Sequence, residues 1–263
     1  MKLFEQIFLS FKFYGETFRF IDRHDLYRLL IIPAILSLGV AFFVAWLAWK
    51  TSEDVIISLL SVFDLRQFSG FVGDIIDFIF RIVIRGLTLF LYLKIFRYLL
   101  LLVLSPSLYW ISGKIQSIAL QEKHDFQFKQ YFKHILRSME IVVLNFIRDI
   151  LLTAIIVVVA IIITWLAPLA PFAIFFVESY FFGYAMIDYR NLFFNMSIKE
   201  SQVVIRRNFG LALGNGICFN LILLIPAIGI MLGPSLALIA AGISIDEAEN
   251  KRGNDTTISK SIQ

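Results

Sequence analysis

Residues 150–187 most constrain the fold of this chain, because they form an almost unbroken apolar run whose only charged side chain is Glu178. Two prolines, Pro168 and Pro171, lie near the middle of the run. Proline removes a backbone donor and breaks helix interiors, so we expect two helical arms. Each arm is about 25 Å long at helical rise, slightly less than a hydrocarbon core of about 30 Å. The arms are residues 150–166 and 172–187, and they predict a helical hairpin in a membrane.

The composition indicates that the rest of the chain also belongs in a lipid bilayer. With 59% apolar and 16% aromatic residues, the chain is too apolar for a soluble globular protein. The apolar segment that follows the basic N-terminal region is longer than a signal-peptide core and lacks a small-residue cleavage pattern. We therefore expect this segment to be retained as a membrane span.

The distribution of charge predicts how the chain is oriented. Lys and Arg are concentrated in residues 1–28, 105–148 and 190–207, whereas residues 50–78 carry five acidic residues against two basic ones. The positive-inside rule places residues 50–78 outside the cell and both termini in the cytoplasm. Because the surplus of positive charge follows the bilayer in this way, it does not indicate a nucleic-acid partner.

The expected fold class is an all-α integral membrane protein that forms a single membrane domain over residues 1–263. It has two long transmembrane helices, two proline-broken hairpins and amphipathic interfacial helices. Ser197 begins the last amphipathic helix with the capping-box pattern SIKE. In chain order the segments are an amphipathic helix 1–28, spans 29–49 and 79–104, an amphipathic helix 126–148, hairpin 150–187, an amphipathic helix 197–208, hairpin 209–245 and a flexible tail 246–263.

The prolines are the expected structural breakers of these helices. The two hairpin turns, APLAP and PAIGIMLGP, contain no charged residue, which favours turns that stop inside the bilayer or an oligomer, as in re-entrant hairpins. Two short, tilted helical pairs that cross the bilayer fully are the alternative, and periodicity does not separate the two. The breakers are Pro33, Pro106, Pro168, Pro171, Pro226 and Pro234.

The sequence contains no pattern typical of an enzyme, a metal site or a cofactor site. The single Cys218 excludes an internal disulfide, and His24, His124 and His134 lack the spacing of metal ligands. There is no glycine-rich phosphate loop and no nucleophile elbow. We therefore expect a protein that is not an enzyme and that uses no cofactor and no metal.

Several stretches together resemble the CysZ sulfate permeases, which are grouped with the etoposide-induced 2.4 membrane proteins. The resemblance runs from about Phe13 to Glu247, and its motifs occur in the family's order and spacing. It is carried by DLYRLLIIPAIL, LSPSLYW, GYAMIDY, SIKESQVVIRRN and LLIPAIGIMLGPSLALIAAG. It implies two long transmembrane helices, two hairpins that only partly penetrate the membrane, cytoplasmic termini and assembly into dimers or larger homo-oligomers.

The resemblance also implies where an anion binds. In sulfate-transporting members, the entry to the first span resembles Gly-Leu-Arg-Arg, whose arginines are associated with oxyanion binding. The corresponding residues here are Asp25, Leu26, Tyr27 and Arg28, so only Leu26 and Arg28 carry over. The loss of one arginine and the gain of Asp25 weaken the case for a divalent anion.

Basic residues near the membrane are the remaining candidates for anion binding. Arg28 stands at a helix N-terminus, where an oxyanion is favoured, but it could equally anchor lipid phosphate. Lys94 and Arg97 lie in the second span, where they either line an anion path or pair with carboxylates that hold helices together. Arg206 and Arg207 match the family's basic stretch, although at least one is expected to be an anchor.

Three residues are candidates for proton coupling, namely His134, Glu178 and Asp188. Asp188 also has a structural interpretation, in which it caps or pairs with a basic helix. Pro171 and Pro234 each begin a segment whose N–H groups would point at an anion if the hairpins are re-entrant, or they are simple helix breakers.

Two functions fit these features. The first is a bacterial inner-membrane, multi-pass anion channel or permease of the CysZ type, which moves sulfate or a similar oxyanion into the cytoplasm. The second is a non-transporting membrane scaffold or assembly factor with the same fold. Whether Lys94 and Arg97 line a water-filled cavity or are neutralised by carboxylates is the feature that discriminates between them.

Overall fold

The fold of residues 3–62, 71–120, 128–225 and 227–261 is described by a computed structural model and is entirely helical. The elements are α1 Leu3–Arg23, α2 Tyr27–Val62, α3 Phe71–Leu120, α4 Phe128–Ile162, the 3-10 helix η2 Thr164–Leu169, α5 Ala170–Phe193, α6 Ile198–Arg207, α7 Phe209–Leu223 and α8 Ile228–Ser261. No strand occurs in these ranges, which confirms the predicted all-α class.

Among the described residues, five helices are long and apolar enough to cross a membrane. The segments concerned are Tyr27–Asp54, Phe78–Ile118, Gln130–Ile162, Thr164–Phe193 and Ile228–Lys251. The α8 segment is 72% buried inside the protein, against 28–33% for the other four. Therefore α8 is the central helix, and the other four expose most of their apolar surface, as lipid-facing helices do.

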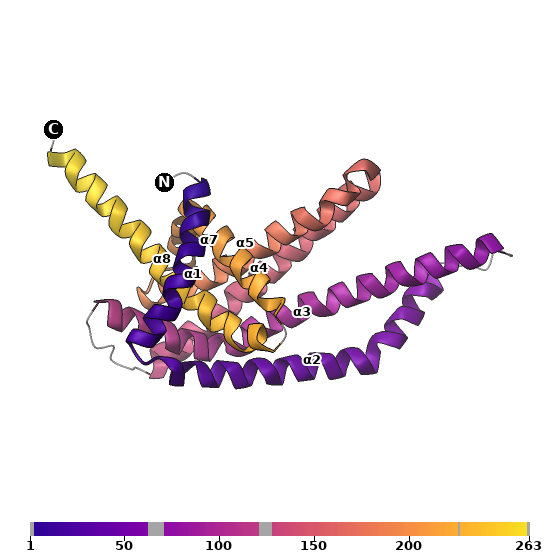
Figure 1. Ribbon diagram of the computed structural model, residues 1–263, viewed down its shortest axis with the longest axis horizontal. Helices are drawn as coiled ribbons and strands as arrows, with labels where there is room; N and C mark the ends of the chain where they lie inside the picture. The colour runs from indigo at the N-terminus through magenta and orange to yellow at the C-terminus, as the bar shows by residue number, and fades with distance from the viewer. Residues whose placement is uncertain (1–2, 63–70, 121–127, 226, 262–263) are drawn as a thin grey trace.

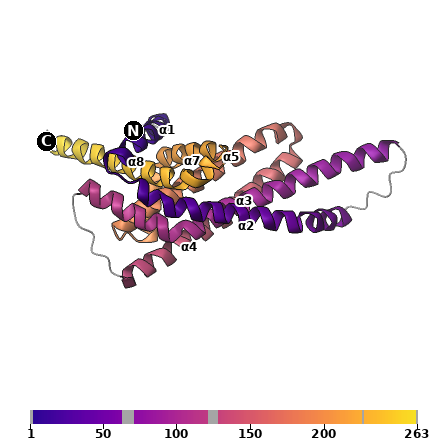
Figure 2. The ribbon, with the colours of Figure 1, turned by 60° about the horizontal axis from the view of Figure 1, so that its bottom comes forward.

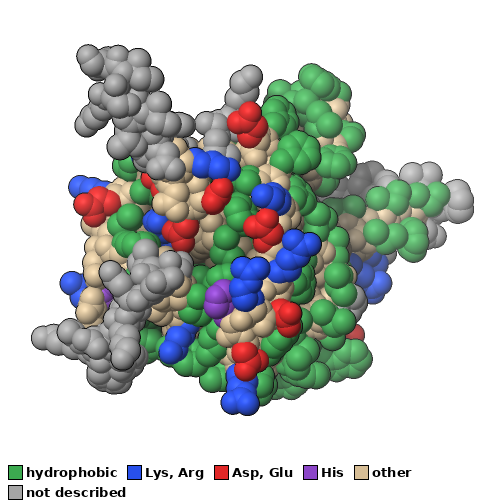
Figure 3. All heavy atoms as spheres, turned by 60° about the vertical axis from the view of Figure 1, so that its left-hand side comes forward, with side chains coloured by type: hydrophobic (Ala, Val, Ile, Leu, Met, Phe, Trp, Pro, Cys, Tyr) green, Lys and Arg blue, Asp and Glu red, His purple; other side chains and the backbone are tan. Residues whose placement is uncertain are grey.

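Two long helical hairpins project from a cluster formed by the remaining helices (Figure 1 and Figure 2). One hairpin is α2 packed along α3, and the other is α4 packed along α5. At the other end, α1 and α8 contact α7. Figure 3 shows that end with Lys, Arg, Asp and Glu side chains gathered on its face and hydrophobic side chains to one side. The charged and apolar surfaces are thus separated along the molecule.

The break in the first hairpin lies slightly earlier than the prolines themselves. Helix α4 ends at Ile162, and Ile163 leaves the helical region with φ −110° and ψ 77°. Pro168 lies inside η2, and Pro171 stands in the first turn of α5, where its missing N–H costs nothing. The predicted amphipathic helix 126–148 and the first arm form one continuous helix over the described residues, because no breaker separates them.

The helices continue through three of the other prolines, so those residues are not breakers. Pro33, Pro106 and Pro234 lie inside α2, α3 and α8, and Pro226 lies outside the described residues. Two predictions were therefore wrong, namely that the second span ends at Pro106 and that the turn of the second hairpin ends at Pro234. Proline removes one backbone hydrogen bond from a helix, and packing of these long helices against their neighbours outweighs that loss.

Helices α5 and α7 touch through their backbones. A Cβ at Gly183 would lie 1.7 Å from the carbonyl oxygen of Ala212, and one at Gly216 would lie 1.6 Å from that of Ser179. Only glycine permits this approach, because any side chain would overlap backbone atoms. The contact joins the second arm of the first hairpin to the first arm of the second.

Helix α1 is docked onto α7 by its polar side chains. A Cβ at Gly214 would lie 2.9 Å from the Ser10 side chain, so α7 is close enough for direct hydrogen bonds. The bonds are Gly210 N to Gln6 Oε1 at 2.9 Å, Ser10 Oγ to Leu211 O at 3.1 Å, and Tyr14 OH to Asn215 O at 3.0 Å. The opposite face exposes Phe4, Phe8, Phe11 and Phe18. An exposed aromatic face of this kind suits a membrane interface.

Candidate functional site

A buried cluster of charges joins α3, α4 and α5. The Lys94 ammonium lies 2.9 Å from Asp149 Oδ2 and 3.3 Å from Glu178 Oε1. It also donates a hydrogen bond to Thr153 Oγ1 at 2.7 Å. Arg97, one turn along α3, donates to the other oxygen of Glu178. Two cations therefore face two carboxylates, and the cluster is neutral.

The side chains of this cluster are largely withdrawn from solvent, with 21% of the Arg97 side chain still exposed. Lys94 and Asp149 expose 3% and 0% of their side chains, and Tyr98 donates a further hydrogen bond to Asp149 at 3.1 Å. A charge facing lipid costs about 2.5 to 3.5 kcal/mol on insertion scales, and pairing avoids that cost. Lys94 and Arg97 are thus neutralised by carboxylates, which is the arrangement that the helix-holding interpretation of these two residues expects.

A second buried carboxylate, Asp188, joins α5 to α4 and α6. Both terminal nitrogens of Arg137 donate hydrogen bonds to the Asp188 carboxylate, at 3.1 and 3.2 Å, and the Ser201 hydroxyl donates another. Such a two-pronged contact between guanidinium and carboxylate is among the stronger ion pairs. Asp188 therefore pairs with the basic amphipathic part of α4. This geometry matches its structural interpretation and gives no support to proton coupling.

A third polar contact ties α5 to the central helix α8. Arg190 approaches Asp246 at 2.6 Å, and Gln116 of α3 donates to the same carboxylate at 3.0 Å. The Arg190 guanidinium also lies 4.3 Å from the centre of the Phe194 ring. No sequence pattern indicated this pair. The available signal was Arg190 itself, a cation at the end of a long apolar run.

The other predicted residues lie apart from these clusters. His134 is buried and stacks on Tyr109, with 5.4 Å between the ring centres. Arg206 is exposed at the end of α6, and the Arg207 guanidinium lies 3.8 Å from Glu249 at the surface. This surface position fits anchoring to headgroups. The structure does not bring these residues together with Arg28, Lys94 or Arg97 in one pocket.

The connection between α1 and α2 contains Arg28 and Leu26. Asp25 adopts φ 49°, a left-handed conformation that favours glycine and that Asp tolerates better than most residues. Leu26 is buried with 6% exposure, so its side chain packs in the core. Arg28 is exposed in the first turn of α2 and forms no ion pair with the described residues. Tyr27 donates a hydrogen bond to Asp22 at 3.3 Å.

A family model described as Sulfate transporter CysZ/Etoposide-induced protein 2.4 matches residues 14–234. The chain belongs to this family. The match covers most of the sequence and confirms the resemblance read from the motifs. The family is of a transporter type and not an enzymatic one. A search of curated proteins found no significant match.

The backbone conformation of Asp25 can be compared with the entry pattern of the CysZ family. In the resemblance, Asp25 stands where the entry pattern has glycine, and its φ of 49° is a conformation that glycine adopts without strain. Relative to that pattern, Asp25 adds a carboxylate and Tyr27 stands in the place of an arginine.

Proposed function

We propose that this CysZ-family member is a channel or permease that moves sulfate or a similar inorganic oxyanion across a bacterial inner membrane into the cytoplasm. The family match over residues 14–234 carries the proposal. Five helices able to cross a membrane supply the necessary architecture.

We propose that Arg28 is the residue that binds the anion. Its guanidinium is exposed at the N-terminal end of α2, where backbone N–H groups and the helix dipole attract negative charge. A guanidinium adds donors arranged to match a tetrahedral oxyanion. Because Arg28 has no ion-pair partner among the described residues, its charge is available to a ligand.

The neutral cluster around Lys94 supports a structural role for the middle of the second span. Its two cations are already compensated by Asp149 and Glu178, so they offer no net charge to an anion. We place the oxyanion path along other surfaces of the protein, beginning at Arg28. The exposed apolar faces of the two hairpins would contact lipid or further copies of the chain in a homo-oligomer.

The direction of transport is limited by electrostatics. Moving a dianion into an inside-negative cell costs roughly 4.6 kcal/mol per 100 mV. Glu178 and Asp188, two of the proton-coupling candidates, are each held by cations. We therefore propose flow that is driven by a concentration gradient or by metabolic consumption of the anion, with both termini in the cytoplasm.

The test is flux of labelled sulfate into proteoliposomes, with empty liposomes as the baseline and with chloride and phosphate as competitors. Arg28→Ala should abolish the flux, whereas Lys199→Ala should not. Lys199 is a suitable control because it is an exposed cation on α6 without an ion pair among the described residues. Arg97→Ala completes the set, and flux lost only in that variant would move the path to the buried cluster.

Failure of transport would favour the scaffold alternative. If folded, oligomeric protein carries no anion above the baseline, the permease proposal is wrong. The neutralised Lys94 and Arg97 would then be regarded as part of a purely structural membrane core.

A further inference from the structure

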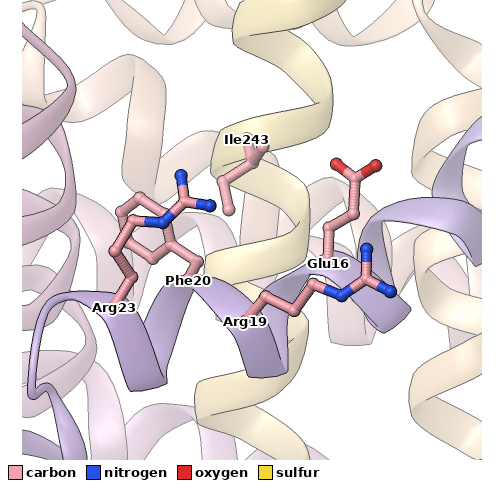
Figure 4. Close-up of a pocket in the computed structure, with 5 residues that line it drawn as sticks. All are labelled: Glu16, Arg19, Phe20, Arg23 and Ile243. Carbon is pink, nitrogen blue, oxygen red and sulfur yellow. The ribbon is translucent and has the colours of Figure 1, made fainter.

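A pocket of about 270 Å³ lies between α1 and α8, away from the Lys94 cluster. It is lined by Glu16, Arg19, Phe20 and Arg23 of α1 and by Ile243 of α8. Figure 4 shows the Arg19 and Arg23 side chains leaving successive turns of α1, with the Arg23 guanidinium on the side of Ile243 of α8 and the Arg19 guanidinium turned the other way, below Glu16. The pocket thus combines two guanidinium groups with an apolar wall.

The positive charge of this pocket is not neutralised by its own acidic residue. The Glu16 carboxylate lies 3.3 Å from the Lys12 ammonium, so its charge is already compensated. Over the ranges that the structure describes, Arg19 and Arg23 form no ion pair. Two positive charges therefore remain at the pocket.

The carboxylates in the nearby part of α8 also have partners that compensate their charge. Each accepts a contact from a residue other than Arg19 and Arg23. The contacts are Asp246 with Arg190 at 2.6 Å, Glu247 with Lys251 at 3.0 Å and Glu249 with Arg207 at 3.8 Å. The facing helix therefore leaves the charge of the two arginines uncompensated.

We propose that this pocket binds a tetrahedral oxyanion, a phosphate or sulfate group, between Arg19 and Arg23. Residues four apart on a helix are neighbours, with Cβ atoms about 5 to 6 Å apart, so the flexible Arg19 side chain can turn towards Arg23 and both guanidinium groups can reach one anion. Guanidinium donors match phosphate and sulfate oxygens in pairs. Phe20 and Ile243 exclude water from one side, which strengthens those contacts.

Two sources supply this chemistry, namely the headgroup of an acidic phospholipid and a free inorganic anion. The exposed aromatic face of α1, which includes Phe18 beside Arg19, would lie at the membrane interface where headgroups are found. The site is separate from Arg28 and does not depend on transport, since the pocket is present whether or not the protein conducts anions.

The test compares the intact protein with R19Q/R23Q. Both arginines are exposed, so the variant should keep its fold, which thermal unfolding and size-exclusion chromatography check. The matched control is K133Q/K199Q, which removes two exposed cations from outside the pocket. Calorimetric titration with sodium sulfate and sodium phosphate, on delipidated protein in detergent, measures the free anion. Native mass spectrometry with phosphatidylglycerol or phosphatidylcholine measures the lipid.

We expect R19Q/R23Q to weaken one of these interactions at least tenfold relative to K133Q/K199Q. Loss of phosphatidylglycerol binding alone assigns the site to a lipid headgroup, and loss of sulfate or phosphate binding assigns it to the free ion. If folded R19Q/R23Q binds all probes as the control does, the proposal is wrong. That result would leave sulfate flux through Arg28 unaffected, so the two proposals fail separately.

Discussion

The Lys94 ammonium lies 2.9 Å from Asp149 Oδ2 in a position where the two side chains expose 3% and 0% of their surface. Because Glu178 approaches the same ammonium, one lysine of α3 joins α4 and α5. This arrangement fixes the first hairpin against the second long span. It also makes the stability of the hairpin depend on a balanced set of charges.

Removing Lys94 should destabilise the protein strongly. Lys94→Met leaves Asp149 buried without its cation, and breaking a buried pair in this way costs about 3 to 5 kcal/mol. The double variant K94M/D149N removes both charges and should recover most of that loss. Thermal unfolding of the three proteins in the same detergent measures the coupling. Equal stability of K94M and the unmodified protein would show that the pair contributes nothing.

Adding a methyl group at Gly183 should separate α5 from α7. The new Cβ would lie 1.7 Å from the Ala212 carbonyl oxygen, a backbone atom that cannot rotate away. We expect Gly183→Ala to cost at least the upper end of the usual 1 to 3 kcal/mol for overpacking. Gly39→Ala is the control, because nothing lies within 4 Å of the added atom. It should stabilise α2 by about 0.5 to 1 kcal/mol. Denaturant titration compares the two, and similar midpoints would contradict the close contact.

The charge and the backbone conformation of Asp25 can be separated by substitution. Asp25→Gly and Asp25→Asn both tolerate a positive φ and remove the carboxylate near Arg28, so both should raise sulfate flux several-fold. Asp25→Val removes the charge but disfavours φ 49°, and should lower stability by roughly 1 to 2 kcal/mol. Flux and thermal unfolding are measured in parallel. Unchanged flux in both tolerant variants would show that the carboxylate does not oppose the anion.

The capping box at the start of α6 gives a prediction about pH. The backbone N–H of Ser197, together with its side chain, holds the pKa of Glu200 below its ordinary value of 4.5. A lowered pKa means that Glu200 contributes stability at pH above 4.5, and that this contribution is lost as the pH falls through the folded pKa. The difference in unfolding temperature between the unmodified protein and Glu200→Ala should therefore shrink below pH 4.5. A difference that grows in acid would reverse the sign of this linkage.

Helix class and membrane location were predictable from the sequence, because long apolar runs and charge clusters report them directly. The capping box at Ser197 was also predictable, since its two partners are three residues apart, and the structure confirms it. Helix ends at prolines were less predictable. Pro106 and Pro234 each remove only one hydrogen bond, and packing against neighbouring helices outweighs that loss.

The partners of buried charges could be anticipated only as a set of possibilities. The sequence placed Lys94 and Arg97 on one face of a helix, but the carboxylates that meet them lie on α4 and α5. Which of the available carboxylates is chosen depends on how three helices cross, and periodicity does not contain that information. The contributions of Thr153 and Tyr98 were missed for the same reason, since a hydroxyl in an apolar run gives no signal of its partner.

The docking of α1 onto α7 has a consequence for how the protein is made. Tyr14 hydrogen-bonds to a carbonyl 201 residues further along the chain. At about 5 to 20 residues per second, the ribosome needs roughly 10 to 40 seconds to deliver that partner. During this interval the polar face of α1 has no surface of its own chain to bind, although its aromatic face can already rest on the bilayer. Helix α1 is therefore synthesised early but docks onto α7 late. A defect in the second hairpin should leave this N-terminal helix undocked and open to proteolysis.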